Sequence, residues 1–361
     1  MMRIRHLVCT DNFAGVERYA ATTSTELARR GHDLEVFGGR REAMTAALGG
    51  SSVSFVDAPG PGAALRASLH GAKPDIVHAH MTGADLVAVA TRPLCRAPVI
   101  STLHFAQARG HDGLTRTLYS VIPRLVTTEV AISQFVADSV SGDPTVIPNG
   151  VPVPAGTSER QVRAPIVLAA QRLESEKSTA VALQAFAASG LTHRGWELHV
   201  AGEGSERARL ERQAIDLGID ASTRFLGRVD DLGRRMGQVS LLLATARAEP
   251  FGLSVVEAMA AGLPVIAADG GAHSETIGSA TPETLFPPGD ADAAAALLRR
   301  FAADPTAREE LGARGRQRHA EAFTIEAHVD ELEELYDQVI AARRDGRPPP
   351  TASGRLSPSD A

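Results

Sequence analysis

The sequence has very few cysteines, because Cys9 and Cys95 are the only two among its 361 residues. Two thiols cannot build a disulfide framework, and they argue against a cysteine-based metal site. Long apolar runs are missing too: no stretch approaches the roughly 20 apolar residues that a membrane-spanning helix needs. Residues 1–11 contain no apolar run followed by a cleavage-like site, as a secretion signal would. We therefore expect a cytoplasmic protein.

An excess of positive charge is also missing. Acidic side chains number 43 against 37 basic ones, and the net charge is −6, so we expect no nucleic-acid partner. Lysine is scarce: Lys73 and Lys177 are the only two, and arginine supplies the rest of the basic residues. The hydrophobic fraction of 43% and the charged fraction of 22% are typical of a globular protein. The length exceeds one ordinary domain and suits two.

Short β-branched runs alternate with longer amphipathic stretches along the whole chain, a pattern that predicts βα units on parallel sheets. A segment dense in Pro and Gly, 148–156, interrupts the pattern and predicts a domain boundary. The predicted strands are 3–9, 33–37, 53–56, 76–79, 99–102, 129–132 and 145–147, and then 166–170, 197–201, 223–226, 240–243, 264–267 and 284–286. The fold class is therefore α/β, with two successive doubly wound sheets.

We divide the chain into four parts on this pattern. Residues 1–155 form an N-terminal Rossmann-like domain, and residues 156–324 form a second one. Residues 325–342 form a final helix. The Pro-, Ser- and Gly-rich tail, 343–361, is expected to be disordered. Ligands of open parallel sheets bind beyond the carboxyl ends of the strands, so the residues that follow each strand are the candidates for a site.

One candidate follows the predicted strand 240–243. A helix is expected to begin near Leu253, and a helix start offers free N–H groups and partial positive charge to a phosphate. Gly252 lets the backbone come close to a ligand. Glu249 and Glu257 flank this start and can accept hydrogen bonds from sugar hydroxyls. The alternative is that both are surface charges and that Glu near a helix start is only good capping.

A second candidate follows the predicted strand 166–170. Arg172 and Lys177 stand there beside the carboxyl ends of the second sheet and can hold a diphosphate. One of only two lysines lies at this junction, although chance remains a competing explanation. Gly202-Glu203-Gly204 follows the next strand but lacks the third glycine of a dinucleotide-binding fingerprint, since residue 207 is Arg207. We interpret it as a tight turn.

Three histidines and a glycine are the candidates in the first half. Gly15 lies in a loop after the first strand, and His104 follows the strand 99–102. A lone histidine is more often structural than catalytic. His78 and His80 point to one face of a strand and could serve as metal ligands. With no carboxylate or cysteine in register, we interpret them as structural and expect no metal site.

Together these motifs resemble the retaining GT-B glycosyltransferases of family 4, and the resemblance covers nearly the whole chain. It rests on residues in the family's order: Val77-His78-Ala79-His80, Thr102-Leu103-His104, Ile147-Pro148-Asn149-Gly150-Val151, Arg172-Leu173 with Glu176-Lys177, Phe225-Leu226-Gly227-Arg228-Val229, Glu249 to Glu257, and Ala260-Ala261-Gly262-Leu263-Pro264-Val265-Ile266-Ala267. It implies a GT-B fold, two Rossmann-like domains that face a central cleft, with the final helix crossing back to the first domain.

The resemblance also implies a role for each candidate. Arg172 and Lys177 neutralise the departing nucleoside diphosphate, with help from the backbone of Phe251, Gly252, Leu253 and Ser254. Glu257 binds the ribose hydroxyls, Glu249 binds the donor sugar, and backbone near Val229 reads the base. His104 approaches the reacting carbon, and Gly15 lets the first loop close on the phosphates. The family transfers sugars from nucleotide donors with retention and generally without a divalent metal, so we expect no cofactor.

The chain departs from the family pattern at three places. Gln171 and Ser178 stand where glycines are usual, and Ala14-Gly15 replaces a common glycine pair. No charged contact is lost. A GT-B sugar-nucleotide epimerase that hydrolyses its substrate, a non-catalytic nucleotide-binding GT-B protein and an NAD-dependent dehydrogenase are the alternatives. The first two fit the intact Arg/Lys and Glu/Glu set poorly, and the broken glycine pattern disfavours the third.

The acceptor is predicted to carry a hydroxyl and to bind mainly to residues 1–155, but its class stays open. Glycan or polysaccharide, glycolipid and natural-product acceptors, and UDP- or GDP-sugar donors, all fit the sequence. A partly apolar stretch, 114–126, is surrounded by arginines and could touch anionic lipid at the inner face of a membrane. The alternative is a solvated helix face. These arginines are Arg92, Arg96, Arg109, Arg116 and Arg124.

Overall fold

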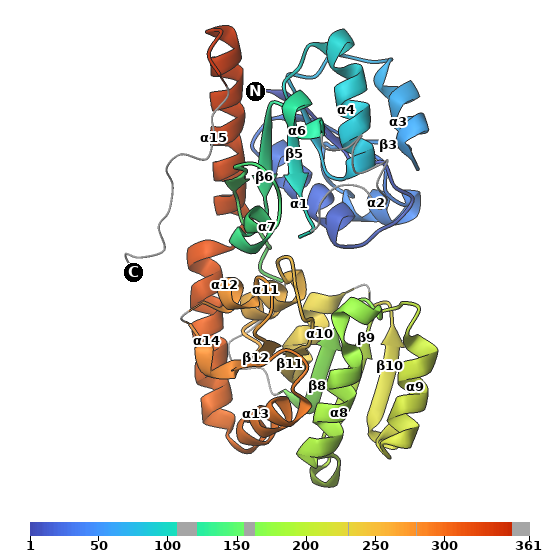
Figure 1. Ribbon diagram of the computed structural model, residues 1–361, viewed down its shortest axis with the longest axis vertical. Helices are drawn as coiled ribbons and strands as arrows, with labels where there is room; N and C mark the ends of the chain where they lie inside the picture. Colours follow the sequence, from blue (N-terminus) through green and yellow to red (C-terminus); the bar gives the residue numbers. More distant parts are fainter. Residues whose placement is uncertain (107–120, 155–162, 230, 279, 349–361) are drawn as a thin grey trace. The chain divides into compact units, whose positions relative to one another are not determined.

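The computed structural model describes residues 1–106, 121–154, 163–229, 231–278 and 280–348 (Figure 1). The chain forms two compact units, each described by itself: Met1–Gly150 with Ile325–Ala361, and Val151–Thr324. The first unit ends at Gly150 rather than at residue 155, because Val151 already belongs to the second. The N–H of Val151 donates to the carbonyl oxygen of Phe323 (2.9 Å), and Val151 forms a β-bridge with Thr324.

The first unit is built on a seven-stranded parallel sheet of order β3-β2-β1-β4-β5-β6-β7. Its central strands are almost completely buried, as expected for β-branched strands covered on both faces. The register places His6 of β1 beside His78 of β4. The strands are β1 (Arg3–Leu7), β2 (Asp33–Phe37), β3 (Ser54–Val56), β4 (Ile76–Ala79), β5 (Val99–Leu103), β6 (Thr128–Ala131) and β7 (Thr145–Val146).

Helices connect these strands: α1 (Gly15–Arg29), α2 (Arg41–Ala47), α3 (Pro61–Ser68), α4 (Thr82–Cys95), α6 (Ile122–Leu125) and α7 (Gln134–Asp138). The final helix, α15 (Ile325–Arg344), belongs to this unit. Its Leu332, Tyr336 and Val339 pack in one apolar cluster with Ile4 and Ile76 of the sheet. The helix therefore completes the first core. Of the predicted tail, 343–361, residues 349–361 lie outside the described part.

The second unit is built on a six-stranded parallel sheet of order β10-β9-β8-β11-β12-β13. Its strands are β8 (Ala164–Ala170), β9 (Glu197–Ala201), β10 (Thr223–Gly227), β11 (Val239–Ala244), β12 (Val265–Ala268) and β13 (Leu285–Phe286). Its helices are α8 (Thr179–Ser189), α9 (Arg207–Asp216), α10 (Leu232–Gln238), α11 (Leu253–Ala260), α12 (His273–Ile277), α13 (Ala291–Ala303) and α14 (Pro305–Ala322). A core of small and branched side chains joins α8 and α13 to the sheet.

The predicted fold class is confirmed, because both sheets are parallel and doubly wound. Predicted strand ends differ from the observed ones by one or two residues. Strand β1, for example, ends at Leu7 rather than at Cys9, whose backbone turns into the left-handed region at φ 57°. Within the described ranges, no helix is long and apolar enough to cross a membrane.

Candidate active site

The candidate residues of the second unit gather at the carboxyl ends of β8 and β11. These two strands are neighbours, with Val167 opposite Leu241 and Leu168 opposite Leu242. The loop after β8 leads through a short 3-10 turn, Ser175–Lys177, into α8, and the loop after β11 leads into α11. Because the strands are parallel, the two loops leave the sheet side by side.

Lys177 and Glu249 meet across these two loops. The ammonium nitrogen of Lys177 lies 2.7 Å from Oε2 of Glu249, and each side chain is only 15% exposed. Charges that are largely withdrawn from water need partners, and each of these side chains supplies the other's. The structure thus brings together two predicted site residues from separate parts of the sequence.

Gln171 holds the loop that carries Lys177. Its amide nitrogen lies 3.0 Å from the carbonyl oxygen of Lys177, 2.9 Å from Oγ1 of Thr179 and 3.1 Å from Oγ1 of Thr245. The hydroxyl of Thr245 donates to the same Lys177 carbonyl (2.9 Å). A glycine at 171 would lack all of these contacts, so Gln171 fixes the Lys177 backbone by means of its side chain.

The backbone at position 178 explains why a glycine is usual there. Its backbone adopts the left-handed conformation, with φ 52° and ψ 38°. A residue with a Cβ pays about 1–2 kcal/mol in that region, whereas glycine does not. Gln171 and Thr245 hold the turn in place despite this strain.

Gly202 and Gly204 are needed because the β8 loop passes directly over them. A Cβ on Gly202 would lie 1.9 Å from the carbonyl oxygen of Gln171, and one on Gly204 would lie 2.3 Å from that of Leu173. The N–H of Leu173 donates to the carbonyl oxygen of Glu203 (2.8 Å). The Gly-x-Gly segment therefore supports the Arg172 loop as a tight turn.

A pair of glycines that the sequence analysis did not single out supports the Glu249 loop. A Cβ on Gly270 would lie 2.2 Å from the carbonyl oxygen of Arg247. A Cβ on Gly271 would lie 2.4 Å from the carbonyl oxygen of Glu249. The loop after β12 therefore lies against the backbone of the Glu249 loop, and the N–H of Ala272 donates to the Glu249 carbonyl (2.7 Å).

Gly252 opens helix α11 in the left-handed conformation, at φ 89°. A Cβ there would lie 3.2 Å from the ring of His273 and 3.5 Å from Cγ of Glu249. Gly252 therefore lies against two side chains of the candidate site, and its close approach to a ligand stays a prediction. Leu253 and Ser254 follow as the half-buried first turn of α11, and Glu257, also half-buried, lies one turn further along.

His273 is a site residue that the sequence analysis missed. It is buried beside Gly252, and burial lowers the pKa of its imidazole, while Glu249 raises it. Its Nδ1 lies 2.9 Å from the carbonyl oxygen of Ala268, which can only accept, so Nδ1 carries the proton and Nε2 is an acceptor. The signal in the sequence was a glycine pair and a histidine after a predicted strand, at the ligand-binding edge of the sheet.

The other predicted residues of the second unit differ in their surroundings. Arg172 is exposed and pairs with Glu176 four residues on (2.7 Å). The side chain of Phe251 is buried and packs edge-on against Phe323, with ring centroids 5.8 Å apart, so this side chain is not available to a ligand. Val229 follows β10, at the edge of the sheet, and is half-buried.

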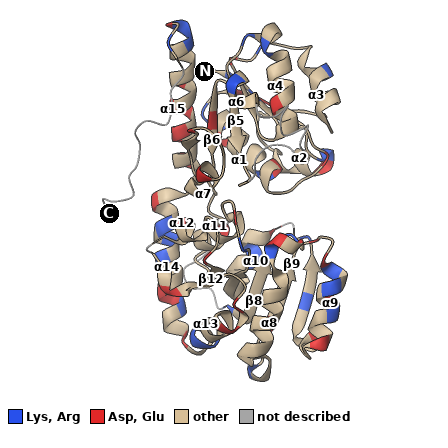
Figure 2. Ribbon diagram, viewed as in Figure 1, with Lys and Arg blue, Asp and Glu red and all other residues tan. Residues whose placement is uncertain are grey.

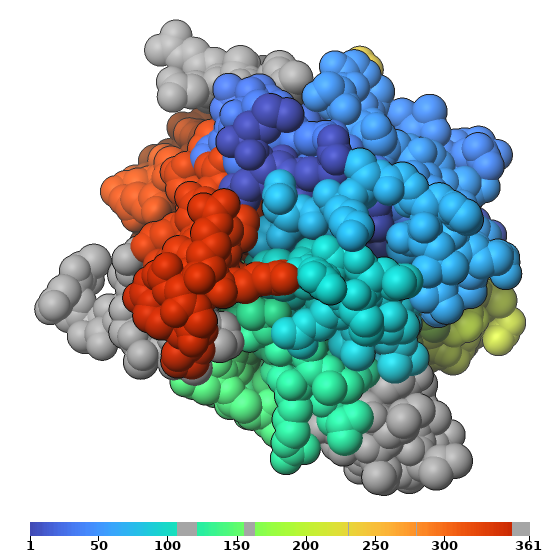
Figure 3. All heavy atoms as spheres, turned by 90° about the horizontal axis from the view of Figure 1, so that it is seen from above, coloured from blue at the N-terminus to red at the C-terminus, as the bar shows by residue number. Residues whose placement is uncertain are grey.

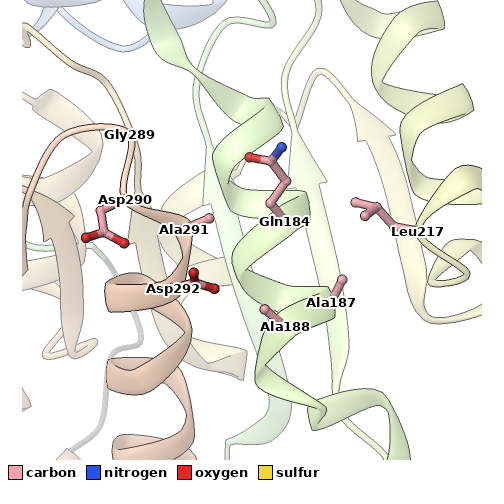
Figure 4. Close-up of a pocket in the computed structure, with 8 residues that line it drawn as sticks. All are labelled: Gln184, Ala187, Ala188, Leu217, Gly289, Asp290, Ala291 and Asp292. Carbon is pink, nitrogen blue, oxygen red and sulfur yellow. The ribbon is translucent and has the colours of Figure 1, made fainter.

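A hollow of about 610 Å³ elsewhere in this unit contains none of the predicted residues (Figure 4). It is lined by α8 and the start of α13, with Asp290, Asp292 and Gln184 as its polar groups. Asp290 already caps α13 by accepting the N–H of Ala293 (2.9 Å). Among the residues that the structure describes, no cation lines this hollow, and a diphosphate needs one.

In the first unit, Gly15 begins helix α1 directly after the loop that follows β1. Buried Glu17 holds this loop: one carboxylate oxygen accepts the N–H of Ala14 (2.8 Å), and the other accepts the hydroxyl of Thr10 (2.6 Å). The loop is thus shaped by Glu17, another residue that the sequence analysis did not single out.

His104 ends a buried chain of three imidazoles. Its Nε2 lies 3.3 Å from Nδ1 of His80, and Nε2 of His80 lies 2.7 Å from Nδ1 of His6. Burial lowers the pKa of His6 and His104 to about 3 and that of His80 well below its usual value, so all three are neutral near pH 7. Register alone brings His6 into this group, because β1 pairs with β4.

The hydrogen bonds between the three imidazoles all run in one direction. A neutral imidazole has one donor and one acceptor, so all three rings must donate in the same sense. The other nitrogen of His6, Nε2, is buried and has no partner in the described part of the chain. An orphaned N–H is rarer than an orphaned acceptor. His6 therefore donates to His80, His80 donates to His104, and His104 keeps its own proton on Nδ1.

His78, Tyr336 and Thr102 complete the cluster. The nitrogens of His78 lie 2.7 Å from the hydroxyl of Tyr336 and 2.6 Å from that of Thr102. His6, His78 and His80 have ligand atoms within 4.8 Å of one another. However, both nitrogens of His78 and His80 already have hydrogen-bond partners, and no carboxylate is among the three. Our interpretation of His78 and His80 as structural stays a prediction, supported by these contacts.

Part of the predicted basic stretch lies outside the described residues, since Arg109, Arg116 and residues 114–120 fall within 107–120. Arg92 and Arg124 lie in α4 and α6, and Arg96 follows α4.

Two family models match this chain. The model of the family "Glycosyltransferase Family 4" matches residues 13–153, and that of "Glycosyl transferases group 1" matches residues 157–318. A glycogen synthase of Mycobacterium tuberculosis is 28% identical over 297 residues, which cover 77% of this chain and 71% of that protein. A phosphatidyl-myo-inositol mannosyltransferase of Mycobacterium leprae is 29% identical over 244 residues, 62% of this chain and 64% of that one.

The fold is shared with solved structures. That of Anabaena HepE, in complex with UDP and glucose, superposes with a TM-score of 0.79 at 19% identity and covers 93% of this chain and 100% of its own. The two family models match consecutive segments, which carry all the strands of the two sheets except β1. The chain therefore belongs to the family 4 glycosyltransferases of the GT-B fold and is a glycosyltransferase.

Proposed function

We propose that the chain transfers a sugar from a UDP- or GDP-sugar to a hydroxyl acceptor with retention of the anomeric configuration. The observation that carries this proposal is the Lys177–Glu249 ion pair beside the start of α11. A departing diphosphate needs a cation, and sugar hydroxyls need a hydrogen-bond acceptor. This pair holds both groups 2.7 Å apart, at one point of the sheet edge.

The pair can bind a donor without being broken. An ammonium group has three donors, and the bond to Glu249 uses one of them, so two remain for phosphate oxygens. Oε2 of Glu249 accepts from Lys177, which leaves the second carboxylate oxygen for a sugar hydroxyl. Through the ion pair, Lys177 can bind the diphosphate while Glu249 binds the sugar of the same donor.

Arg172 is expected to change partners when the diphosphate arrives. Its ion pair with Glu176 is exposed, with side-chain exposures of 53% and 54%. Such a pair contributes about 0.2–1 kcal/mol, and the fork of donors on a guanidinium matches a phosphate better than one carboxylate oxygen. The N–H groups at the start of α11, including those of Leu253 and Ser254, add the positive end of a helix.

The reaction breaks the bond between the anomeric carbon and the phosphate oxygen and forms one to the acceptor oxygen. The proton of the acceptor hydroxyl passes to the leaving diphosphate when attack comes from the leaving group's own face. Arg172 and Lys177 stabilise the negative charge that develops there, which is the task that a divalent metal performs elsewhere. We expect His104 to donate a hydrogen bond from Nδ1 to the sugar, and Gly15 to let its loop approach the phosphates.

Two of the similar proteins support the choice of substrates to test. Anabaena HepE was solved with UDP and glucose, and one relative is a phosphatidyl-myo-inositol mannosyltransferase. A uridine donor and a lipid-linked acceptor therefore belong in the first screen, beside GDP-, ADP- and dTDP-sugars and soluble sugar acceptors.

The test is a thermal-shift screen of these four donor classes, followed by NMR of the product formed from the donor that binds. We expect one nucleotide class to raise the melting temperature and the product to keep the α or β configuration of the donor. We also expect turnover to survive EDTA. An inverted product would refute retention, and strict dependence on a divalent metal would refute the leaving-group mechanism. Free sugar as the sole product would point to a hydrolase.

A further inference from the structure

A second hollow, of about 620 Å³, lies in the first unit and is lined by four arginines. It is formed by the last turns of α4, the residues just before β5 and β6, and the last turns of α15. Figure 3 views this end of the unit, where the red end of α15 meets the cyan and green segments that carry α4 and α6. The lining residues are Val89, Arg92, Pro93, Arg96, Pro98, Leu125, Thr127, Val339, Ala342, Arg343 and Arg347.

The hollow is separate from the candidate active site. Pro98 and Thr127 come directly before β5 and β6, so it lies at the amino edge of the parallel sheet. His104 follows the carboxyl end of β5, and Gly15 follows that of β1. Donor and acceptor bind at the carboxyl edge of such sheets. The occupant of this hollow is therefore neither of the two substrates at their proposed site.

The charge around the hollow is unbalanced, because none of the described residues that line it is acidic. Arg92 donates to the carbonyl oxygen of Leu125 (2.6 Å), which orients its guanidinium without offsetting the charge. Arg347 pairs with Asp345. For Arg96 and Arg343, no hydrogen bond from the guanidinium and no ion pair is found among the described residues. Figure 2 shows basic residues at the end of α15 and on α6.

Several arginines elsewhere on this chain have carboxylate partners, whereas others, such as Arg163 and Arg308, donate to backbone carbonyls. Arg29 and Arg30 both pair with Glu26, and Arg224 pairs with Glu197. Several guanidinium groups around one hollow repel one another, and an anion that enters removes that repulsion. The guanidinium fork matches carboxylate and phosphate oxygens, and phosphate offers more of them to several arginines at once.

Apart from Thr127, the rest of the lining is apolar. Val89, Pro93, Pro98, Val339 and Ala342 offer carbon surface beside the arginines. At this end of the unit, Leu94 is 56% exposed and Leu125 is 42% exposed. The volume lies within the range of about 300–1,000 Å³ found for small-molecule sites. A ligand that fills the hollow thus has an anionic part and an apolar part.

We propose that this hollow binds a phosphate monoester or diester that carries an apolar substituent, with the phosphate held by Arg96 and Arg343. A water-soluble ester and a lipid headgroup share this chemistry. The proposal does not depend on the transferase mechanism, since it uses none of the residues assigned to it.

The test uses the full chain and two probes. Hexyl phosphate is titrated by calorimetry, with inorganic phosphate as the polar comparison. Vesicles of phosphatidylglycerol in phosphatidylcholine are compared, by co-sedimentation, with pure phosphatidylcholine. We expect hexyl phosphate to bind at least fivefold more tightly than inorganic phosphate, and binding to weaken as salt is raised. Co-sedimentation with the anionic vesicles identifies a lipid headgroup as the source, and its absence identifies a soluble ester.

A pair of double variants separates the site from general charge. Arg96→Gln with Arg343→Gln removes the two guanidinium groups from the hollow. Arg209→Gln with Arg212→Gln removes the same charge from α9 of the second unit, where both side chains are exposed. We expect the first variant to bind hexyl phosphate at least tenfold more weakly and the control to stay within twofold, with melting temperatures that match the wild type. The proposal is overturned if hexyl phosphate does not bind, or if both variants lose binding equally.

Discussion

Replacing Glu249 with glutamine tests the ion pair that carries the proposed function. The change keeps the size of the side chain and removes its charge. A hydrogen bond to a charged group contributes about 1.5–3 kcal/mol, against about 1 kcal/mol for a neutral one. If Glu249 holds the sugar in the transition state, the loss of about 0.5–2 kcal/mol corresponds to a roughly 2- to 30-fold fall in kcat/KM.

The stability of the second unit should change as well. Glutamine leaves the Lys177 ammonium, only 15% exposed, without a counter-charge. Breaking a fully buried pair costs about 3–5 kcal/mol, and residual contact with water reduces this to about 2 kcal/mol here. For a unit of this size we expect the melting temperature to fall by about 4–8 °C. Because two charges in contact are coupled, Lys177→Met combined with Glu249→Gln should be destabilised by less than the sum of the single changes.

The assay is kcat/KM for the donor, measured far below the melting temperature, together with thermal unfolding of the two single variants and the double variant. Glu211→Gln is the matched control, because it removes the same charge from an exposed pair with Arg207 in the same unit. We expect the control to retain wild-type kcat/KM and stability. Full activity of Glu249→Gln would refute the site assignment, and strictly additive stabilities would refute the ion pair.

Four further predictions follow from particular residues. Ser178→Gly should stabilise the second unit by about 1 kcal/mol in denaturant unfolding, because it relieves the left-handed strain at φ 52°; a loss of stability would contradict this. Gly252→Ala should raise the KM for the donor, because the added Cβ meets the ring of His273. Gly218→Ala is the control: its φ is also positive, at 67°, but an added Cβ has no neighbour within 4 Å, so only stability should fall. Equal KM values for the two variants would contradict the close approach. Lowering the pH from 7.5 to 5.5 should destabilise the first unit by about 1 kcal/mol for each buried histidine of the cluster, measured by thermal unfolding. The unfolded imidazoles gain protons below about pH 6.5, whereas folded His6 and His104, whose pKa burial lowers to about 3, stay neutral over this range. A flat profile would contradict their neutral burial. Nitrogen-15 NMR should find the His104 proton on Nδ1, and a proton on Nε2 would reverse the inferred direction of the imidazole chain.

The sequence predicts the two sheets and the edge at which the candidates gather, for a simple physical reason. Periodicity defines the strands, parallel strands point the same way, and the residues after β8 and β11 must therefore meet at one edge. That argument places Arg172, Lys177 and Glu249 near one another without any knowledge of side-chain contacts. The family resemblance adds their expected roles, which the geometry alone does not assign.

The contacts that shape the site could not be predicted, because they join residues far apart in the sequence. Lys177 and Glu249 are separated by 72 positions. Gln171 looked like a departure from the pattern and proves to hold the Lys177 backbone through its side chain. Gly270 and Gly271 leave no room for a Cβ beside the Glu249 loop, and the His273 ring lies against Gly252, and no pattern of residue types encodes these contacts. His6 reaches His80 only because β1 pairs with β4 in one particular register.

The most direct test of the account is lysine footprinting with an amine-reactive reagent, because the chain has only two lysines. Lys177 lies in the proposed donor site, and Lys73 is an exposed residue of the first unit that serves as an internal control. We predict that the nucleotide sugar found in the screen protects Lys177 from modification and leaves the rate at Lys73 unchanged. Modification of Lys177 at the same rate with and without a saturating donor would contradict the central claim that this residue binds the diphosphate.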